Sequence, residues 1–351
     1  MNTHGKAEFL PLPGTHFPHV ELDLVGSAVG KTVIDGAVDL GDSTRTCDLG
    51  RALPLTVRQS ETARWPADML TARWHADWRG RHAGEYSDPK VAVHRLSTGA
   101  GGVAELEVTR TDWGQVQGAQ AGFLALHGES AGRIRFLSRL LSGSPAPVPN
   151  IAAVHGVIET ADGMILLNQR GPQVNYHPLT WSCSFEEGME PGDLGAGSHA
   201  LERTAARGMA EEFGVQADLD RMTVLGLLGD TTAMSVAAVV YCRIPAPGDG
   251  TYGQVKSARA PDAWEHTRHL LVPASPEAMA RLLLGVAPPG DSTSPERSDA
   301  GQEHDSLSWH PTSRCRLLLT MLFRFGRRRT AAALARATTD AAHVRPPRPV
   351  D

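Results

Sequence analysis

The segment that most constrains the fold runs from Trp181 to Val215, WSCSFEEGMEPGDLGAGSHALERTAARGMAEEFGV. Its first part gathers acidic residues in a turn, and a Gly/Ser bend follows. Residues 198–213 then have the composition and apolar spacing of an amphipathic helix. Gly214 follows directly, and glycine is the residue that most readily takes the left-handed conformation that ends a helix. The pattern predicts a loop, a helix over 198–213 and an abrupt stop.

Two adjacent carboxylates, Glu211 and Glu212, close this helix. The helix dipole disfavours acids at that end, so the pair needs a compensating cation, either Arg207 four residues earlier or a bound metal ion. At 100° per residue both acids lie at the edge of an apolar stripe that includes Ala205 and Met209. Carboxylates there are poor core residues and good ligands for a hard divalent cation. The spacing alone is also compatible with a second interpretation, in which the two acids form a solvated helix end and bind no metal.

Residues 187–215 resemble the Nudix box, the signature of the Nudix hydrolase family. The second half, RGMAEEFGV, matches the family pattern at each fixed position except one, because Gly208 stands where the family has Glu. The first half is looser. Asp193 takes the place of the Glu in Glu-x-Gly-Glu, and Glu186-Glu187 falls where a Gly-Gly pair is usual. Thirteen residues rather than seven separate Asp193 from Arg207, so the loop carries an insertion.

The resemblance implies an α/β fold, a Nudix-type α/β/α sandwich with a mixed sheet. It also implies a hydrolase that cleaves a diphosphate linkage in a nucleoside diphosphate derivative by metal-activated water, with Mg²⁺ or Mn²⁺ as cofactor and a small-molecule diphosphate as substrate. The implied catalytic residues are Arg207, Glu211, Glu212 and Glu265. The implied metal ligands are Glu211 and Glu212, with Asp193, Glu187 or Glu190 in place of the acid lost at Gly208.

Two residues outside the box have alternative interpretations. Arg170 closes a predicted strand and matches an Arg that lies near the diphosphate in the family; a solvated strand-end Arg fits the pattern equally. Glu265 lies at a late position where the family can have a further metal ligand or the general base, although no motif anchors it. Because Gly208 removes a charge and costs a helix about 1 kcal/mol relative to Ala, a second function stays open. This is a catalytically weak or inactive Nudix-like module that binds a nucleotide or sugar nucleotide.

Stretches rich in Pro, Gly and Ser indicate linkers and so predict the domain organisation. The stretch SGSPAPVPN (142–150) is a linker between two domains. The predicted parts are a flexible tail at 1–18, an α+β N-terminal domain of unknown role at 19–141, the linker, a Nudix-like domain at 151–327 with a disordered insert at 286–306, and a flexible tail at 328–351.

Alternation and apolar runs predict the main elements. Expected strands cover 19–29, 91–111, 224–230 and 234–244, together with a hairpin at 151–170 whose turn is Asp162-Gly163. Expected helices cover 132–141, 276–285 and 313–325, the last ending at Gly326.

Composition narrows the function classes. The chain has 351 residues and a net charge of −5, so it has no overall attraction for nucleic acid or an anionic membrane. Its four cysteines are scattered without zinc spacing, which favours reduced thiols. The N-terminus has no signal-peptide pattern, and no apolar run is long enough for a membrane span. We expect a cytoplasmic protein that binds neither nucleic acid nor membrane. Its oligomeric state stays open.

Overall fold

The computed structural model describes residues 33–34, 37–39, 52, 55–61, 88–98, 104–141, 143–230, 233–244, 260–284 and 309–344. The predicted tail at 1–18, the strand at 19–29 and the insert at 286–306 lie outside these residues. Within them, no helix is both long and apolar enough to cross a membrane.

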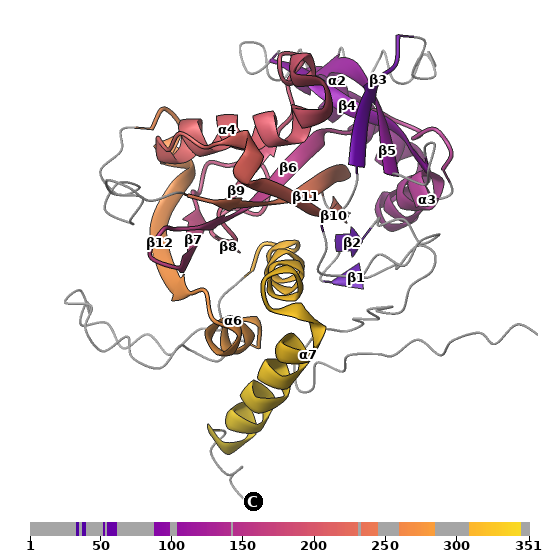
Figure 1. The fold of residues 1–351 in the computed structure, drawn as a ribbon. Coiled ribbons are helices and arrows are strands. Elements are labelled where there is room, and N and C mark those ends of the chain that lie inside the picture. Colours follow the sequence, from indigo (N-terminus) through magenta and orange to yellow (C-terminus); the bar gives the residue numbers. More distant parts are fainter. Residues whose placement is uncertain are drawn as a thin grey trace, which may run out of the picture.

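The centre of the structure is a mixed sheet (Figure 1). Its main path runs β1 (Val33–Ile34), β2 (Ala37–Asp39), β10 (Met222–Asp230), β11 (Ser235–Arg243), β6 (Ala152–Glu159), β7 (Met164–Arg170) and β12 (His266–Pro273). Off this path, β8 (Trp181–Ser182) pairs with β7 and β9 (Phe185–Gly188) pairs with β6. Strands β11 and β6 are parallel, whereas β10 and β11 are antiparallel. The expectation of an α/β fold with a mixed sheet is confirmed.

Helices cover both faces of this sheet (Figure 1). On one face, α4 (Ala200–Phe213) packs its apolar stripe with Val154 and Ile158 of β6. On the other face, α6 (Pro276–Leu283) and α7 (Ser313–Val344) pack with Val157, the β6 residue that points the opposite way. Strand β11 lies between the two layers, and its residues are buried up to Arg243. This double cover explains its nearly continuous apolar sequence.

The earlier part of the chain forms a second, three-stranded sheet in the order β3 (Leu55–Gln59), β5 (Ala104–Asp112) and β4 (Pro89–Thr98). Two helices follow it, α2 (Trp113–His127) and α3 (Glu129–Leu141). The sequence predicted α3 but not α2, whose Gly-, Ala- and Gln-rich residues show little amphipathic pattern. The Asp112 side chain caps α2 by accepting a 2.7 Å hydrogen bond from Gln115 N.

Strand β4 connects the two sheets. Val91 N donates to Met189 O at 2.9 Å, and Val93 N donates to Asn150 O at 3.1 Å. The apolar core beneath α4 continues into β4, β5, α2 and α3. Segment 143–150, predicted as a linker, contributes the buried residues Ala146 and Val148 to this core. The division into two domains stays a prediction.

The C-terminal helix differs from the prediction. The backbone at Gly326 has φ 73° and ψ 163°, so the first helical segment ends there as expected. A second segment then continues to Val344, where the sequence predicted a flexible tail at 328–351. Its Ala-rich composition favours helix. Ala333, Leu334 and Ala337 are buried in the cluster that includes α6, and this packing stabilises the segment.

Candidate functional site

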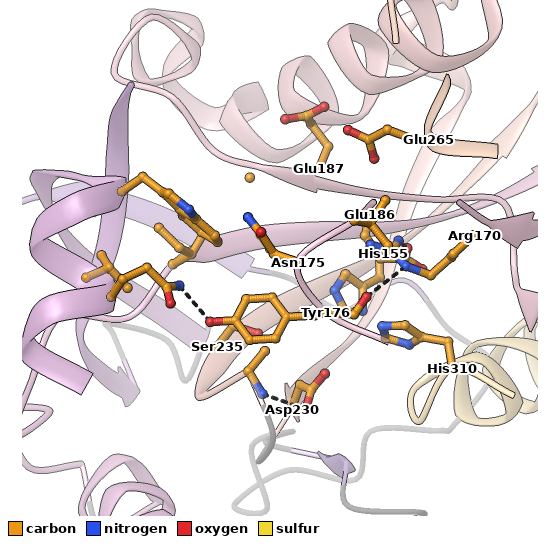
Figure 2. A pocket seen from close by; sticks show the side chains of 18 of the residues that line it. His155, Arg170, Asn175, Tyr176, Glu186, Glu187, Asp230, Ser235, Glu265 and His310 are labelled. Carbon is orange, nitrogen blue, oxygen red and sulfur yellow. Dashed lines mark hydrogen bonds and ion pairs between the residues drawn. The ribbon is translucent and has the colours of Figure 1, made fainter. Parts of the chain in front are cut away.

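A pocket of about 240 Å³ lies between α2, the segment 171–176 after β7, strand β9 and the 3-10 helix η4 (Ala263–Glu265) (Figure 2). Its lining includes one guanidinium and four carboxyl groups, so acidic side chains outnumber basic ones. Its charged residues are Arg170, Glu186, Glu187, Asp230 and Glu265, and its large aromatic residues are Trp113, Tyr176 and Trp264.

Helix α4 approaches one end of this pocket with its C-terminal turn. The helix begins at Ala200 rather than at the predicted Ser198, because the 3-10 helix η2 (Asp193–His199) occupies the inserted loop. It ends as predicted, with Gly214 in the left-handed region at φ 64°. Glu212 lies on the buried face of α4, whereas the side chain of Glu211 is 36% exposed. The two adjacent acids therefore have different surroundings.

Arg207 holds the acids of the box together. Its guanidinium contacts four carboxylates, and these contacts hold both β9 and the loop after it against α4. Its Nη1 lies 2.9 Å from Glu187, 3.1 Å from Glu211 and 3.4 Å from Glu190, and its Nη2 lies 3.0 Å from Asp193 and 2.7 Å from Gly188 O. The catalytic role of Arg207 stays a prediction.

Two of the proposed metal ligands are engaged elsewhere. Asp193 is 3% exposed, and its Oδ2 accepts hydrogen bonds from Glu190 N at 2.9 Å and Thr204 Oγ1 at 3.1 Å, as well as from Arg207. Glu190 pairs with Lys90 at 2.9 Å. Neither acid lines the pocket. Asp193 and Glu190 thus stabilise the loop and the junction with β4.

Glu187 comes nearer to the place of the missing acid. A Cβ built on Gly208 would lie 2.9 Å from Glu187 Cβ and 3.0 Å from the ring of Phe185. Real Cβ atoms need more room, so Gly208 leaves the space that Glu187 and Phe185 occupy. Both departures from the box are visible in the sequence, but only the structure shows that they face each other. The predicted box thus has a glycine at position 208 of α4 and an acid at the adjacent position 187 of β9.

Burial changes the protonation of these acids. It raises the pKa of Glu187 to about 7, against the lowering effect of Arg207. Burial also raises the pKa of Glu212 well above its usual value, and the charges of Glu265 and Glu187 add to this. The pKa of Glu265 is raised by burial as well. Among the described residues, no three of these carboxylates have oxygens that all lie within 4.8 Å of one another.

His266 is the partner of Glu212. Its Nε2 lies 2.7 Å from Glu212 Oε2, and its ring stacks on Phe213 at a centroid distance of 4.9 Å. Burial lowers the pKa of His266 to about 3, so its imidazole is neutral at physiological pH. Together with the raised pKa of Glu212, this favours a neutral carboxyl–imidazole pair. Helix η4 completes this end of the pocket, since Asp262 N donates to Glu211 O at 2.9 Å.

Arg170 lies in the middle of the pocket wall. It is 8% exposed, which excludes a solvated strand-end position. Its guanidinium pairs with Glu186, and its Nε donates to Tyr176 O at 3.2 Å. Figure 2 shows Glu187 and Glu265 at one end of the pocket, with Tyr176 and Asp230 towards the other. Of the pocket-lining residues in the described part of the chain, Arg170 is the one Lys or Arg.

Sequence reasoning missed the other wall. Trp113 and Gln117 of α2 line the pocket, and Gln117 Nε2 donates to the Tyr176 hydroxyl at 2.6 Å. The rings of Trp113 and Tyr176 meet edge to face at 6.2 Å. No local signal could have revealed this wall, because its parts lie about 60 residues apart in the chain and carry no motif.

The raised pKa of Glu187 predicts a pH-dependent stability difference. An acid whose pKa is higher in the folded state stabilises the fold below its unfolded pKa of 4.5, and loses this contribution as pH rises through about 7. Glu187→Gln should therefore gain stability relative to the native chain across that range, by up to about 3 kcal/mol. Urea unfolding of both proteins at pH 5 and pH 8, in EDTA, measures the difference.

The measured quantity is the difference in the free energy of unfolding between Glu187→Gln and the native chain. A difference is needed because buried histidines make each protein more stable as pH rises, which is the opposite of the effect of Glu187. His266, with its pKa lowered from 6.5 to about 3, makes the fold more stable as pH rises through that interval. This contribution cancels when the variant is compared with the native chain. A difference that is constant between pH 5 and pH 8 would contradict the raised pKa of Glu187.

Comparisons with known proteins give a partial likeness. No protein-family model matches the chain, and no curated protein matches it. Solved structures that are similar to part of it include a MutT/nudix family protein from Enterococcus faecalis (14% identity, TM-score 0.26, covering 35% of this chain and 44% of that one). Another is a MutT protein from Methanosarcina mazei Go1 (16% identity, TM-score 0.28, covering 49% and 92%).

A third is a bifunctional NMN adenylyltransferase/ADP ribose pyrophosphatase from Francisella tularensis, complexed with AMP and a Mn ion (14% identity, TM-score 0.25, covering 44% and 42%). The present chain thus spans less than half the length of the first and the third of these proteins.

Proposed function

We propose that this protein is a Nudix-type hydrolase. It cleaves a diphosphate linkage in a nucleoside diphosphate derivative, using water activated by Mg²⁺ or Mn²⁺. The observation that carries the proposal is the exchange between positions 187 and 208. The acid lost from the helix is supplied by β9, next to Arg207 and at the pocket end where Glu265 also lies. The box therefore keeps its complement of acids despite its divergent sequence.

The charge of the pocket supports a metal requirement. One guanidinium against four carboxylates repels a bare diphosphate. Buried carboxylates with raised pKa values also lack sufficient countercharge, which a hard divalent cation provides. Glu187, Glu211 and Glu212 are the residues that would hold such an ion. When bound, it supplies charge neutralisation at the diphosphate and lowers the pKa of water.

The remaining side chains have separate tasks. Arg207 keeps Glu187 and Glu211 oriented through the contacts at 2.9 and 3.1 Å. Arg170 offers a guanidinium to a phosphate oxygen that passes the middle of the pocket. Burial raises the pKa of Glu265, which makes its carboxylate a stronger base. Glu265 is therefore suited to accept a proton from the attacking water. The base and sugar would lie towards Trp113 and Tyr176.

A substrate panel tests the proposal. Nucleoside diphosphate sugars, dinucleotides and nucleoside triphosphates are each incubated with the protein and Mg²⁺ or Mn²⁺, and products are separated by anion-exchange chromatography. At least one substrate should give a nucleoside monophosphate, and EDTA should abolish its formation. If no member of the panel yields a metal-dependent product, the hydrolase assignment fails.

The second candidate is a Nudix-like binding module for a nucleotide or sugar nucleotide. It is favoured by the ion pairs of Arg207 with Glu187, Glu190 and Asp193, and by the distances between the carboxylates, no three of which among the described residues come within 4.8 Å of one another. This function predicts that a ligand raises the melting temperature equally with and without EDTA. The hydrolase predicts stabilisation by a diphosphate that depends on the metal.

A further inference from the structure

A second group of potential ligands lies away from Glu187 and Glu265. His177, Asp230 and His310 come from three separate parts of the chain: the segment between β7 and β8, the end of β10, and the residues just before α7. Each offers one ligand atom, and these three atoms all lie within 4.8 Å of one another. His177 Nε2 is 2.9 Å from Asp230 Oδ2. Among the described residues, this is the group of His, Cys, Asp and Glu side chains that meets that spacing.

Burial and access suit an ion-binding site. Asp230 and His310 are 2% and 3% exposed, yet both line the pocket, so an ion that they held could be reached from it. A tetrahedral ion with nitrogen and oxygen ligands at about 2.0–2.2 Å needs ligand atoms roughly 3.4 Å apart. The distance between His177 Nε2 and Asp230 Oδ2 is 2.9 Å, and no distance between ligand atoms in the group exceeds 4.8 Å. Small side-chain movements would therefore complete the coordination.

The surroundings fix the orientation of both buried groups. Asp230 Oδ1 accepts a hydrogen bond from Ala233 N at 3.1 Å, which leaves Oδ2 towards the histidines. His310 Nδ1 lies 3.0 Å from Thr312 Oγ1. In the tautomer that donates to this hydroxyl, the lone pair of Nε2 is available, as in histidines that ligate metals. Thr312 N and Arg316 Nη2 donate to Nδ1 at 3.3 and 3.2 Å in this structure, which places the ring proton on Nε2. Ion binding through Nε2 therefore requires the other tautomer and the loss of these two contacts.

One cation lies next to the group: Arg316 Nη2 is 3.2 Å from His310 Nδ1. The same guanidinium is paired with Glu186, and Asp230 adds a carboxylate to the group itself. Burial lowers the pKa of His310 well below its usual value, so this imidazole is neutral at physiological pH. His177 has a φ of 52°, in the left-handed region that non-glycine residues seldom adopt. Such backbone strain is typical of residues that the surrounding structure holds in place for a function.

We propose that His177, Asp230 and His310 form a binding site for one divalent transition-metal ion of the zinc class. Its two imidazoles and one carboxylate select a borderline ion such as Zn²⁺ or Co²⁺. The carboxylates at the other end of the pocket offer oxygen only and suit Mg²⁺. The site does not depend on the proposed hydrolysis.

Cobalt binding tests the site directly. The full-length chain, stripped with chelator and dialysed, is titrated with Co²⁺ while its visible absorption is recorded, and bound Zn²⁺ is then counted after competition. We expect one equivalent with the strong d–d bands of four- or five-coordinate cobalt, and displacement by Zn²⁺. His177→Ala should raise the dissociation constant for Co²⁺ at this site at least 30-fold. The half-buried position of His177 in a connecting segment makes this variant the least disruptive of the three.

Two controls complete the experiment. His199→Ala removes an exposed histidine on η2 and should leave the Co²⁺ bound at this site unchanged. Far-UV circular dichroism checks that each variant is folded. The proposal is overturned if His177→Ala binds Co²⁺ as tightly as the native chain, or if the bound cobalt shows only the weak bands of octahedral oxygen coordination.

Discussion

Glu212→Gln should lower kcat/KM for metal-dependent hydrolysis by about a thousandfold while leaving the protein at least as stable. Loss of a carboxylate that would hold the metal removes several kcal/mol of transition-state stabilisation. The fold does not need the charge, because Glu212 is buried next to a neutral His266 and its pKa is raised. Glutamine keeps the shape and can donate a hydrogen bond to that imidazole. Steady-state kinetics and thermal unfolding at pH 7.5 measure the two effects.

The matched control is Glu202→Gln, on the first turn of the same helix. It makes the same chemical change at a half-buried position of α4 that does not line the pocket, and it should alter kcat/KM by less than about twofold. Equal activity in Glu212→Gln and the native chain would remove Glu212 from the catalytic machinery. A parallel loss of melting temperature would instead indicate a structural role.

The exchange between Gly208 and Glu187 predicts strong coupling between the two positions. Glu187→Gly should lower kcat/KM by about a hundredfold or more, because it removes the acid that replaces the helical one. Gly208→Glu alone should be destabilising by roughly 1–3 kcal/mol, since its Cβ would overlap Glu187 Cβ at 2.9 Å and the Phe185 ring at 3.0 Å. The double variant should recover activity at least tenfold relative to Glu187→Gly.

A double-mutant cycle in both activity and urea unfolding measures this coupling. Recovery should be partial, because the contact with Phe185 remains in the double variant. Gly208→Ala is the control for packing alone: it brings the same Cβ contact without a carboxylate and should not rescue Glu187→Gly. Additive effects of the two substitutions would show that the positions do not substitute for each other.

The sequence predicted correctly those elements whose structure is determined by neighbouring residues or by hydrophobic periodicity. Gly214 ended α4, Gly163 formed the hairpin turn at φ 76°, and the apolar run of β11 lay between two layers. Each depends on neighbouring residues or on periodicity. The second segment of α7 was predicted as a tail, because its helix depends on packing against α6 rather than on pattern alone.

The site was predictable only in part, for the same reason. The box motif identified Arg207, Glu211 and Glu212, which share one helix. It could not rank Asp193, Glu190 and Glu187, because their roles depend on where η2, Lys90 and β9 lie in space. His310 and Asp230 are distant in sequence and carry no motif. Their proximity follows from the order of strands in the sheet and from the start of α7.

The junction at β4 has a consequence for how this protein can be divided. Trp113 and Gln117 belong to the region before residue 142, whereas Arg170 and Glu187 belong to the region after residue 150, yet all four line one cavity. A fragment that starts at Ile151 would expose the apolar surface that α2 and β4 now cover. The pocket therefore depends on both regions of the chain, and a fragment made from either one alone would lack part of the pocket wall.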